Sequence, residues 1–420
     1  MNKWHNVVID DCCDILDHLR VPVNGQDRQN MKGDIPYYGA NGLQGYINDF
    51  IFDEDLILIA EDGGNFEEYD TRPIAYKISG KSWVNNHAHI LKAKPEYCQD
   101  YIFYSLVNKN IVRFIAGGTR SKLNKSELIK IPIYCPQNPI EQQKIAKILT
   151  TTDTVMEKTQ AAITKYKAIK QGMLNDLFTR GIDIKTGKLR PKKEDAPELY
   201  KESKLGMIPK DWDDEKLGCI GEFKNGVNKD KTSFGHGTLF VNIGDAYHEI
   251  LDCSTLDRVL VSYTEKQQYN LINGDIIFVR SSVKPDGVGY NTIFLEFNDD
   301  VVFCGFMIRF RLNDKTKYNP EFYNSYFRYI EFRRRLLCVS TVSANTNVNQ
   351  VALSNLFAIK PNEKEQLEIA KRLRIINNKI HTEENYLHKL QQIKSGLMAD
   401  LLGGKKLVSI PNELETENSN

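Results

Sequence analysis

Long apolar runs, an excess of one charge and paired cysteines are all missing from this sequence of 420 residues. No run approaches the roughly 18 consecutive apolar residues of a membrane span. The first residues lead into Asp10 and Asp11 instead of an apolar segment, so no secretory signal is predicted. We therefore expect a soluble, cytoplasmic protein. Its formal charge of +1, from 56 basic and 55 acidic residues, neither indicates nor excludes a polyanionic partner, because local patches matter more than totals.

Signatures of catalysis and of metal binding are missing as well. The eight cysteines form no C-x-x-C pair and have no histidine at zinc-finger spacing, which argues against a disulfide framework and a zinc knuckle. The motifs G-x-S-x-G and H-E-x-x-H and the Pro-Pro-aromatic motif of amino methylation do not occur. Segment 181–189 resembles a P-loop, but Leu189 replaces its Mg²⁺-binding hydroxyl. His87 and His89 have no third ligand at suitable spacing, so we predict neither a metal nor an active site.

What the chain does contain is an internal repeat. Residues 138–178 align without a gap on 362–402 at an offset of 224, with 13 identities in 41 positions. Both copies begin with a capping-box pattern, in which Asn138 or Asn362 precedes a glutamate by three residues. Each copy is therefore predicted to form one long helix.

The two helices are predicted to pack on each other, because each has an apolar seam with a period of 3.5 residues. Polar residues interrupt the seam at matching levels, which would fix the register: Thr159 matches Glu383, and Lys170 matches Lys394. The predicted seam consists of Leu149, Met156, Ile163, Tyr166, Lys170 and Leu177 in the first copy, and of Leu373, Ile380, Leu387, Leu390, Lys394 and Leu401 in the second.

The segments before the two helices also echo each other. Acidic or glycine turns lead into buried strands at 53–59 and 273–279, and helical stretches follow at 97–115 and 320–337. We predict an α+β fold with a pseudo-two-fold repeat, in which two mixed α/β domains are separated by a pair of long antiparallel coiled-coil helices. The expected boundaries are 1–137 for the first domain, 138–180 for its helix, 181–205 for a polar linker outside the core, 206–361 for the second domain, 362–402 for its helix, and 403–420 for a flexible tail.

Candidate nucleic-acid contacts lie in polar loops and turns, where side chains on short, adaptable segments can give hydrogen bonds to bases or phosphates. The candidates in the first half are Tyr37, Tyr38, Asn41, Arg120, Lys122 and Asn124, and those in the second half are Arg280, Ser281, Lys284, Asn345, Asn347 and Asn349. Each could instead be loop scaffolding. Segment 327–335 interleaves aromatic residues with arginines and suits either phosphate contact or a solvated helix surface equally well.

The repeat of a variable segment plus a near-identical helix resembles the specificity subunit of type I restriction-modification enzymes. Four segments carry the resemblance: 205–212 (LGMIPKDW), 117–128 (GGTRSKLNKSEL), 131–136 (IPIYCP) and 141–146 (EQQKIA). The likeness covers nearly the whole chain. One departure is that Trp4 stands where Trp212 stands in the second half, without the preceding Gly-x-Ile-Pro.

The resemblance implies a non-catalytic subunit whose two recognition domains each read one half of a split double-stranded DNA site, directing adenine methylation and restriction. It also implies two methylation subunits and two restriction-translocase subunits as partners, with S-adenosylmethionine, ATP and Mg²⁺ bound by those partners and no cofactor bound by this chain. Two alternatives stay open: a self-contained DNA modification enzyme or nuclease with an unrecognised active site, and a coiled-coil adaptor without DNA affinity.

Overall fold

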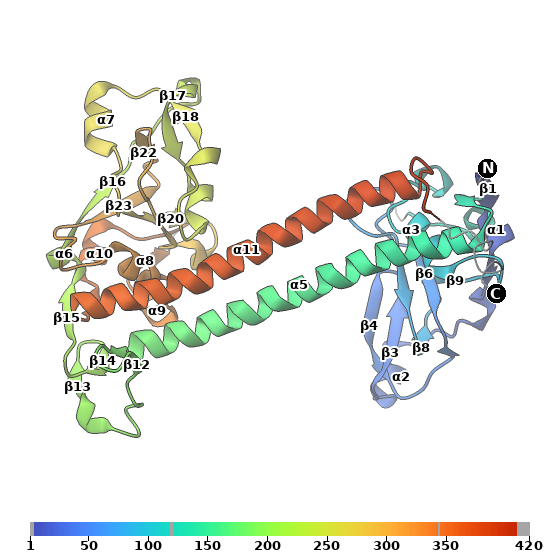
Figure 1. Cartoon of the computed structure of the whole chain (residues 1–420), viewed down its shortest axis with the longest axis horizontal. Helices are drawn as coiled ribbons and strands as arrows, with labels where there is room; N and C mark the ends of the chain where they lie inside the picture. Colours follow the sequence, from blue (N-terminus) through green and yellow to red (C-terminus); the bar gives the residue numbers. More distant parts are fainter. Residues whose placement is uncertain (1–3, 118–120, 343–344, 410–420) are drawn as a thin grey trace, which may run out of the picture. The chain divides into compact units, whose positions relative to one another are not determined.

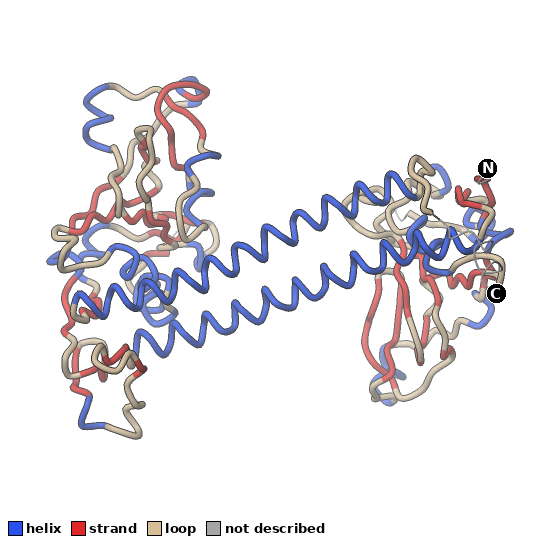
Figure 2. The backbone as a smooth tube through the Cα atoms, viewed as in Figure 1, coloured by secondary structure: helices blue, strands red, loops and turns tan. Residues whose placement is uncertain are grey.

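The computed structural model describes residues 4–117, 121–342 and 345–409. The chain divides into two compact units: unit 1 comprises residues up to 161 together with those from 384 onward, and unit 2 comprises 162–383. Each unit combines a globular α/β part with portions of two long helices (Figures 1 and 2). No helix within the described ranges is long and apolar enough to cross a membrane.

The two long helices are α5 (Pro139–Thr179) and α11 (Glu363–Leu401). Their ends lie close to the predicted positions, because their start signals are local. The side chain of Asn138 accepts a hydrogen bond from the amide of Ile140 at 2.9 Å, and that of Asn362 accepts one from the amide of Glu365 at 3.0 Å. The capping box itself is only half formed, because Glu365 turns into the core and bonds to other segments.

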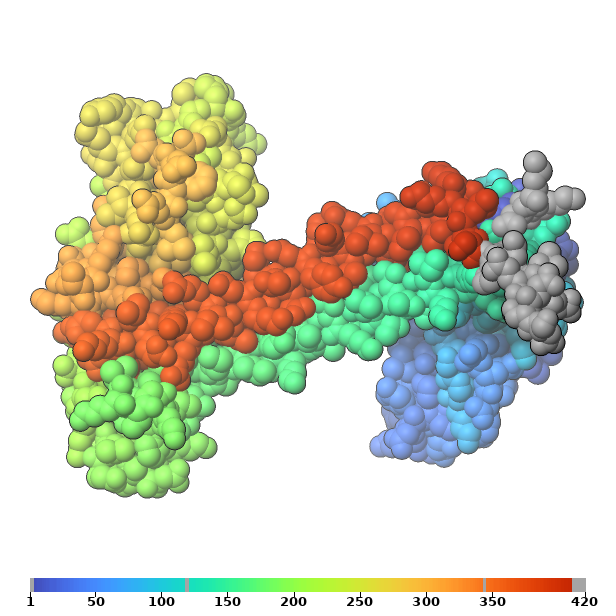
Figure 3. Space-filling model, in the orientation of Figure 1, coloured from blue at the N-terminus to red at the C-terminus, as the bar shows by residue number. Residues whose placement is uncertain are grey.

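The helices run antiparallel, as predicted. In unit 1, Asp153 near the start of α5 pairs with Lys394 near the end of α11 at 2.6 Å. Figure 3 shows the surfaces of the two helices lying against each other. In unit 2, the end of α5 shares one hydrophobic core with the start of α11, where Leu177 and Leu373 are both buried. Of the twelve predicted seam residues, seven are buried and five are half-buried: Leu149, Ile163, Leu177, Leu373, Ile380, Leu390 and Leu401 are buried, and Met156, Tyr166, Lys170, Leu387 and Lys394 are half-buried.

Each unit contains a four-stranded sheet with the same topology, in which the first strand along the chain pairs with the fourth, the fourth with the second, and the second with the third. In unit 1 the order is β2 (Cys13–Ile15), β9 (Ala88–Ala93), β6 (Leu56–Ala60), β7 (Ala75–Ile78). In unit 2 it is β16 (Gly221–Asn225), β23 (Met307–Leu312), β19 (Ile276–Val279), β21 (Asn291–Ile293). Every residue of β6 and β19 is buried, as the apolar runs predict.

Each unit has further helices and strands besides its four-stranded sheet. Unit 1 adds β1 (Trp4–Val8), α1 (Ile9–Cys12), α2 (Gly25–Asn30), β3 (Ile35–Gly39), β4 (Gly42–Ile47), β5 (Phe52–Asp53), β8 (Lys81–Val84), α3 (Gln99–Leu106), α4 (Lys125–Leu128) and β10 (Pro132–Pro136). Unit 2 adds β15 (Asp213–Lys216), α6 (Leu217–Ile220), β17 (Phe234–Val241), β18 (Asp257–Val259), α7 (Tyr263–Tyr269), β20 (Ser281–Ser282), β22 (Val301–Phe303), α8 (Pro320–Arg328), α9 (Ile330–Cys338), β24 (Thr341–Val342), β25 (Thr346–Asn347), α10 (Gln350–Asn355) and β26 (Phe357–Lys360).

The helical stretches before the long helices are shorter than predicted. The stretch 97–115 contains α3 and a 3₁₀ turn at Val112–Phe114, and the stretch 320–337 is divided between α8 and α9. Tyr329 separates these two helices because its backbone is extended, with ψ near 138°. The aromatic side chains on both sides of this break pack into the core of unit 2.

The segment 181–205 departs from its prediction as a polar linker outside the core. It forms one hairpin, β11 (Ile182–Asp183) with β12 (Lys188–Leu189), and the first strand of a second, in which β13 (Tyr200–Ser203) pairs with β14 (Gly206–Pro209). Ile182 is fully buried and Arg190 is 8% exposed. The reason is a distant partner, because the guanidinium of Arg190 donates to the buried carboxylate of Glu365 at 2.6 and 3.0 Å. A charge paired in this way can enter a core.

Candidate nucleic-acid interface

In unit 2, a three-stranded ribbon extends from the end of the central strand β19. β20 pairs with β25, and β25 pairs with β24, so that Asn347 stands opposite both Ser281 and Thr341. The amide of Val348 donates to the carbonyl of Arg280 at 3.0 Å, which fixes the ribbon to the sheet. The fold therefore brings together five of the predicted residues: Arg280, Ser281, Lys284, Asn345 and Asn347 all lie on this ribbon or beside it.

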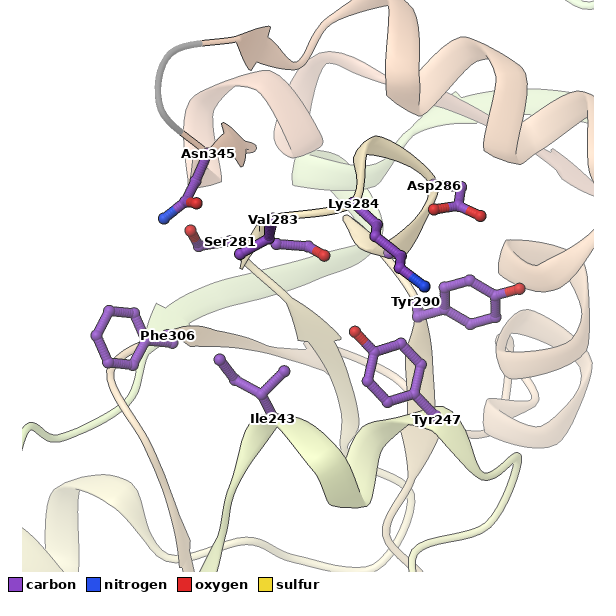
Figure 4. A pocket seen from close by; sticks show the side chains of 11 residues that line it. Ile243, Tyr247, Ser281, Val283, Lys284, Asp286, Tyr290, Phe306 and Asn345 are labelled. Atoms are coloured by element: carbon purple, nitrogen blue, oxygen red, sulfur yellow. The ribbon is translucent and has the colours of Figure 1, made fainter. Parts of the chain in front are cut away.

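A cleft of about 740 Å³ opens beside the ribbon. Ser281, Lys284 and Asn345 line it, together with residues that the sequence analysis did not select (Figure 4). The rings of Tyr247 and Tyr290 form one wall, with centroids 5.5 Å apart. The remaining lining residues are Ile243, Ser282, Val283, Asp286, Gly287 and Phe306.

Two arginines hold the wall of the cleft, of which Arg333 is buried and Arg328 is half-buried. Arg333 lies 4.7 Å from the ring centroid of Tyr290 and donates to the carbonyl of Asp286 at 2.6 Å. Arg328 donates to the carbonyl of His248 at 2.8 Å. Burial lowers the pKa of both guanidinium groups. Of the two roles open to segment 327–335, phosphate contact therefore does not fit Arg328 and Arg333, whose side chains support the cleft from behind.

The surface around the cleft mixes exposed apolar side chains with hydrogen-bonding groups. Val283 is 81% exposed and Phe306 is 56% exposed, although both are apolar. Lys284, which lines the cleft, forms no ion pair with any residue in the part of the chain that the structure describes. A ribbon of two or three strands fits the major groove of DNA, where amides and hydroxyls read base edges and apolar side chains contact thymine methyl groups.

Unit 1 has a quasi-equivalent ribbon at the end of its own central strand, β6. Asp62 and Ala116 both bridge to Lys122, in the arrangement that Ser281 and Thr341 have around Asn347. The amide of Leu123 donates to the carbonyl of Glu61 at 2.7 Å, as Val348 does to Arg280. The duplication therefore extends from the helices to the ribbons.

Two of the predicted residues of unit 1 meet at this ribbon. Asn41 donates to the carbonyl of Gly63 at 2.9 Å, one residue from the bridge between Asp62 and Lys122. Lys122 pairs with Glu61 at 3.1 Å, and Glu61 also accepts from Arg20 at 2.6 Å. Burial by itself raises the pKa of Glu61, but hydrogen bonds from these two cations outweigh burial and lower it.

His89 anchors this ribbon to the sheet. The imidazole is 1% exposed, with Nδ1 2.6 Å from the carboxylate of Asp17 and Nε2 2.8 Å from the carbonyl of Leu123. His87 instead lies beside Asp62, with Nδ1 at 3.1 Å. Across the described ranges, no group of three or more His, Cys, Asp or Glu side chains could hold a metal ion.

The other predicted contacts lie elsewhere. Tyr37, one of the predicted contacts, is 2% exposed and packs in a small core with Ile47 and Trp83, so it is a core residue. Tyr38 is half-buried with its ring against Tyr76. Arg120 lies outside the described residues.

Two further candidates stand at helix starts. Asn124 and Asn349 are the N-caps of α4 and α10, and the side chain of Asn349 accepts from the amide of Ala352 at 2.8 Å. A capping amide is already engaged, so Asn349 has a structural role in the described arrangement.

Sequence reasoning missed the apolar and aromatic lining of the cleft. Tyr247 is the last residue of a short 3₁₀ helix, and Phe306 lies in the tight turn between β22 and β23. Neither position belongs to a periodic pattern. A large apolar residue at a turn tip, directly after Gly305, is the one available signal, because such a position is usually solvent-exposed.

Comparison with known proteins agrees with the duplicated architecture. The chain is 37% identical over 142 residues to a type I restriction enzyme specificity subunit of Haemophilus influenzae, a match that spans 34% of this chain and 35% of that protein. It is 24% identical over 397 residues to the MjaVIII specificity subunit of Methanocaldococcus jannaschii, covering 90% of this chain and 87% of the relative.

Among solved structures, the S subunit of the type I restriction-modification system of M. genitalium has the same fold, with a TM-score of 0.64, 14% identity and 97% of both chains covered. The family model for the type I restriction modification DNA specificity domain matches residues 1–165 and again residues 209–392. With both halves matched, this chain belongs to the family of type I restriction-modification specificity subunits, which are not themselves catalytic.

Proposed function

We propose that this chain is the sequence-specific DNA-binding subunit of a type I restriction-modification complex and that it reads a target in two separate parts. The observation that carries the proposal is the pair of quasi-equivalent ribbons, one at the end of β6 and one at the end of β19. Segments 1–137 and 206–361 would each read one half-site. The helices in 138–180 and 362–402 would set the distance between them, with 181–205 as their connection and 403–420 as a tail.

The proposed contacts follow the ribbons. In unit 1 they are Asn41 and Lys122, and in unit 2 they are Ser281, Lys284, Asn345 and Asn347, joined by Tyr247, Val283 and Phe306 from the cleft. Contacts to the DNA backbone would position the ribbons, and side chains at the base edges would supply specificity. We propose Arg120 as a further DNA contact on the basis of the sequence alone.

Catalysis would reside on partner subunits. We infer two methylation subunits and two restriction-translocase subunits, which would bind S-adenosylmethionine, ATP and Mg²⁺. We also infer a cytoplasmic site of action, where such a complex would meet DNA. The rival function, a self-contained modification enzyme or nuclease, makes an opposite prediction. Turnover of DNA by the isolated chain, supplied with S-adenosylmethionine, ATP and Mg²⁺, would contradict our proposal.

The direct test is to sequence the DNA methylated by the chain in complex with its methylation subunit. A motif of two short blocks separated by a gap of fixed length is expected, and a continuous motif would overturn the two-part reading. Lys284→Ala should relax one block and Lys122→Ala the other. Loss of a base contact should cost about 1–3 kcal/mol of discrimination at one position. Lys210→Ala is the matched control, because Lys210 is exposed and lies outside the cleft.

A further inference from the structure

A carboxylate in unit 2 ties the globular part to both long helices. The side chain of Glu249 accepts hydrogen bonds from Lys170 of α5 at 2.5 Å, from Asn377 of α11 at 2.8 Å and from Ser325 of α8 at 3.3 Å. The side chains of Lys170 and Glu249 are only 19% and 18% exposed. Three elements therefore meet at one half-buried charge.

The backbone segment that carries Glu249 leads into the wall of the cleft. Arg328 holds the carbonyl of His248, and Asn324 donates to the carbonyl of Glu249 at 3.0 Å. Tyr247, two residues before Glu249, forms the cleft wall. A shift of the helices relative to Glu249 would therefore move the wall of the proposed reading site.

Unit 1 has a polar junction built from corresponding positions. Asp153 of α5 accepts from Lys394 of α11 at 2.6 Å and from the hydroxyl of Tyr104 of α3 at 2.7 Å. The ammonium of Lys394 also lies 5.7 Å from the ring centroid of Tyr104. Here too, one carboxylate joins both long helices to a helix of the globular part.

The two junctions are related by the repeat. The offset of 224 that aligns the long helices maps Lys170 onto Lys394 and Asp153 onto Asn377. Outside the long helices, Cys98 and Asn319 occupy equivalent positions, because their amides donate to Gln142 and Gln366.

Counting six residues onward from this pair gives Tyr104 and Ser325. Each junction thus has a lysine, a hydroxyl and one carboxylate. The carboxylate belongs to the long helix in unit 1 and to the globular part in unit 2.

We propose that Glu249 is a positioning residue that fixes the orientation of the second recognition segment on the spacer helices and thereby the length of the gap accepted between the half-sites. The inference rests on the function proposed above. One carboxylate that satisfies donors from three elements has one favourable geometry, since any tilt lengthens at least one short charge-assisted hydrogen bond. Residues that share such a network are energetically coupled.

The test compares the gap lengths in DNA methylated by complexes containing Glu249→Gln or the wild-type chain. We expect both half-site sequences to be unchanged, while the preference for the natural gap over gaps one base pair longer or shorter falls about tenfold. The charge swap Lys170→Glu with Glu249→Lys should restore the preference, because Asn377 Oδ1 lacks a partner within the described structure and can accept from the new lysine. A role limited to stability would lower yield without changing the gap.

The matched control is Glu321→Gln. Glu321 also pairs α8 with α11, through Arg374 at 3.2 Å, but this pair is exposed and involves only one long helix, so no change in gap preference is expected. An unchanged gap distribution in Glu249→Gln would overturn the inference.

If Glu249→Gln fails to assemble, Lys170→Met removes the same ion pair from the helix side. An unchanged gap distribution in Lys170→Met would overturn the inference equally. Absence of any split motif from wild-type complexes would instead refute the proposed function.

Discussion

Two buried glutamates at corresponding positions of the long helices are predicted to respond in opposite ways to the same substitution. Glu365 in α11 and Glu141 in α5 are both fully buried. The carboxylate of Glu365 accepts from Arg190, from the indole of Trp212 at 2.9 Å and from the amide of Ile182 at 2.7 Å. Neither oxygen of Glu141 has a partner within the described structure. The perturbation is Glu→Gln at each position.

The expected magnitudes follow from these partners. Breaking a buried ion pair by removing one charge costs about 3–5 kcal/mol, because the remaining charge is left uncompensated. Burial by itself lowers the pKa of Arg190, but its hydrogen bonds to Glu365 prevail and raise it, so the guanidinium stays charged. Arg190 retains Asp211 at 2.5 Å, so Glu365→Gln is expected at the lower end, at about 3 kcal/mol.

Glu141→Gln removes a buried carboxylate that has no compensating partner, and the effect should therefore be neutral or stabilising, by up to about 2 kcal/mol. Among the described residues, Glu141 thus has none of the partners that Arg190, Trp212 and Ile182 provide for Glu365.

Urea unfolding of the purified chain measures the effect of each substitution on stability. Hydrogen exchange of segments in each unit shows in which unit the effect occurs. Glu365→Gln should lower the midpoint and speed exchange in unit 2. Glu141→Gln should leave unit 1 unchanged or slow its exchange. If the two substitutions destabilised the chain equally, the reasoning would be refuted. The charged and hydrogen-bonding partners of Glu365 would then contribute nothing to stability beyond what a buried amide provides.

Three further outcomes are expected. The pKa of Asp17 is lowered, because hydrogen bonds with His89 and Ile90 outweigh the effect of burial. The contribution of Asp17 to stability should therefore be complete above about pH 4 and be lost as the pH falls through the lower pKa of the folded state. Asp17→Asn should accordingly flatten the acid side of a plot of the urea midpoint against pH. Inserting four residues near Ala161 adds about 6 Å of helix and should lengthen the gap between the half-sites by one or two base pairs, with both half-site sequences unchanged. Methylome sequencing of a complex that still methylates DNA would measure the gap. Tyr37→Ala should cost about 3–5 kcal/mol in unfolding experiments because the ring is in a core, whereas Tyr247→Ala should weaken DNA binding in a gel shift with little change in stability.

The long helices and the central strands were predictable because their signals are local or repeated. A gapless offset of 224 and a period of 3.5 residues need no knowledge of tertiary structure. The helix starts agree closely with prediction because Asn138 and Asn362 cap amides only two and three residues further along the chain. The runs containing β6 and β19 are apolar on both faces, which only a strand buried on both sides tolerates.

The errors arose where a residue's role depends on a distant partner. Arg190 lies in a polar, proline-containing segment, and its burial depends on Glu365, 175 positions away in the sequence. Tyr37 is buried by Trp83, which also comes from a different part of the chain. In contrast, the N-cap role of Asn349 was within reach of sequence reasoning, because Asn followed by a short helical pattern is a start signal. By residue type alone, an asparagine side chain fits a helix cap and a base contact equally well.

The two ribbons show why half-site contacts are harder to predict than the scaffold that presents them. Corresponding backbone positions carry Glu61 and Arg280, and likewise Lys122 and Asn347, so the ladder is kept while the chemistry differs. In unit 1, Lys122 is already paired with Glu61, whereas no ion pair of Lys284 occurs anywhere in the described ranges of unit 2. Backbone pairing can therefore repeat without repeating the charges above it, and that separation lets one duplicated fold present two different surfaces to two different DNA sequences.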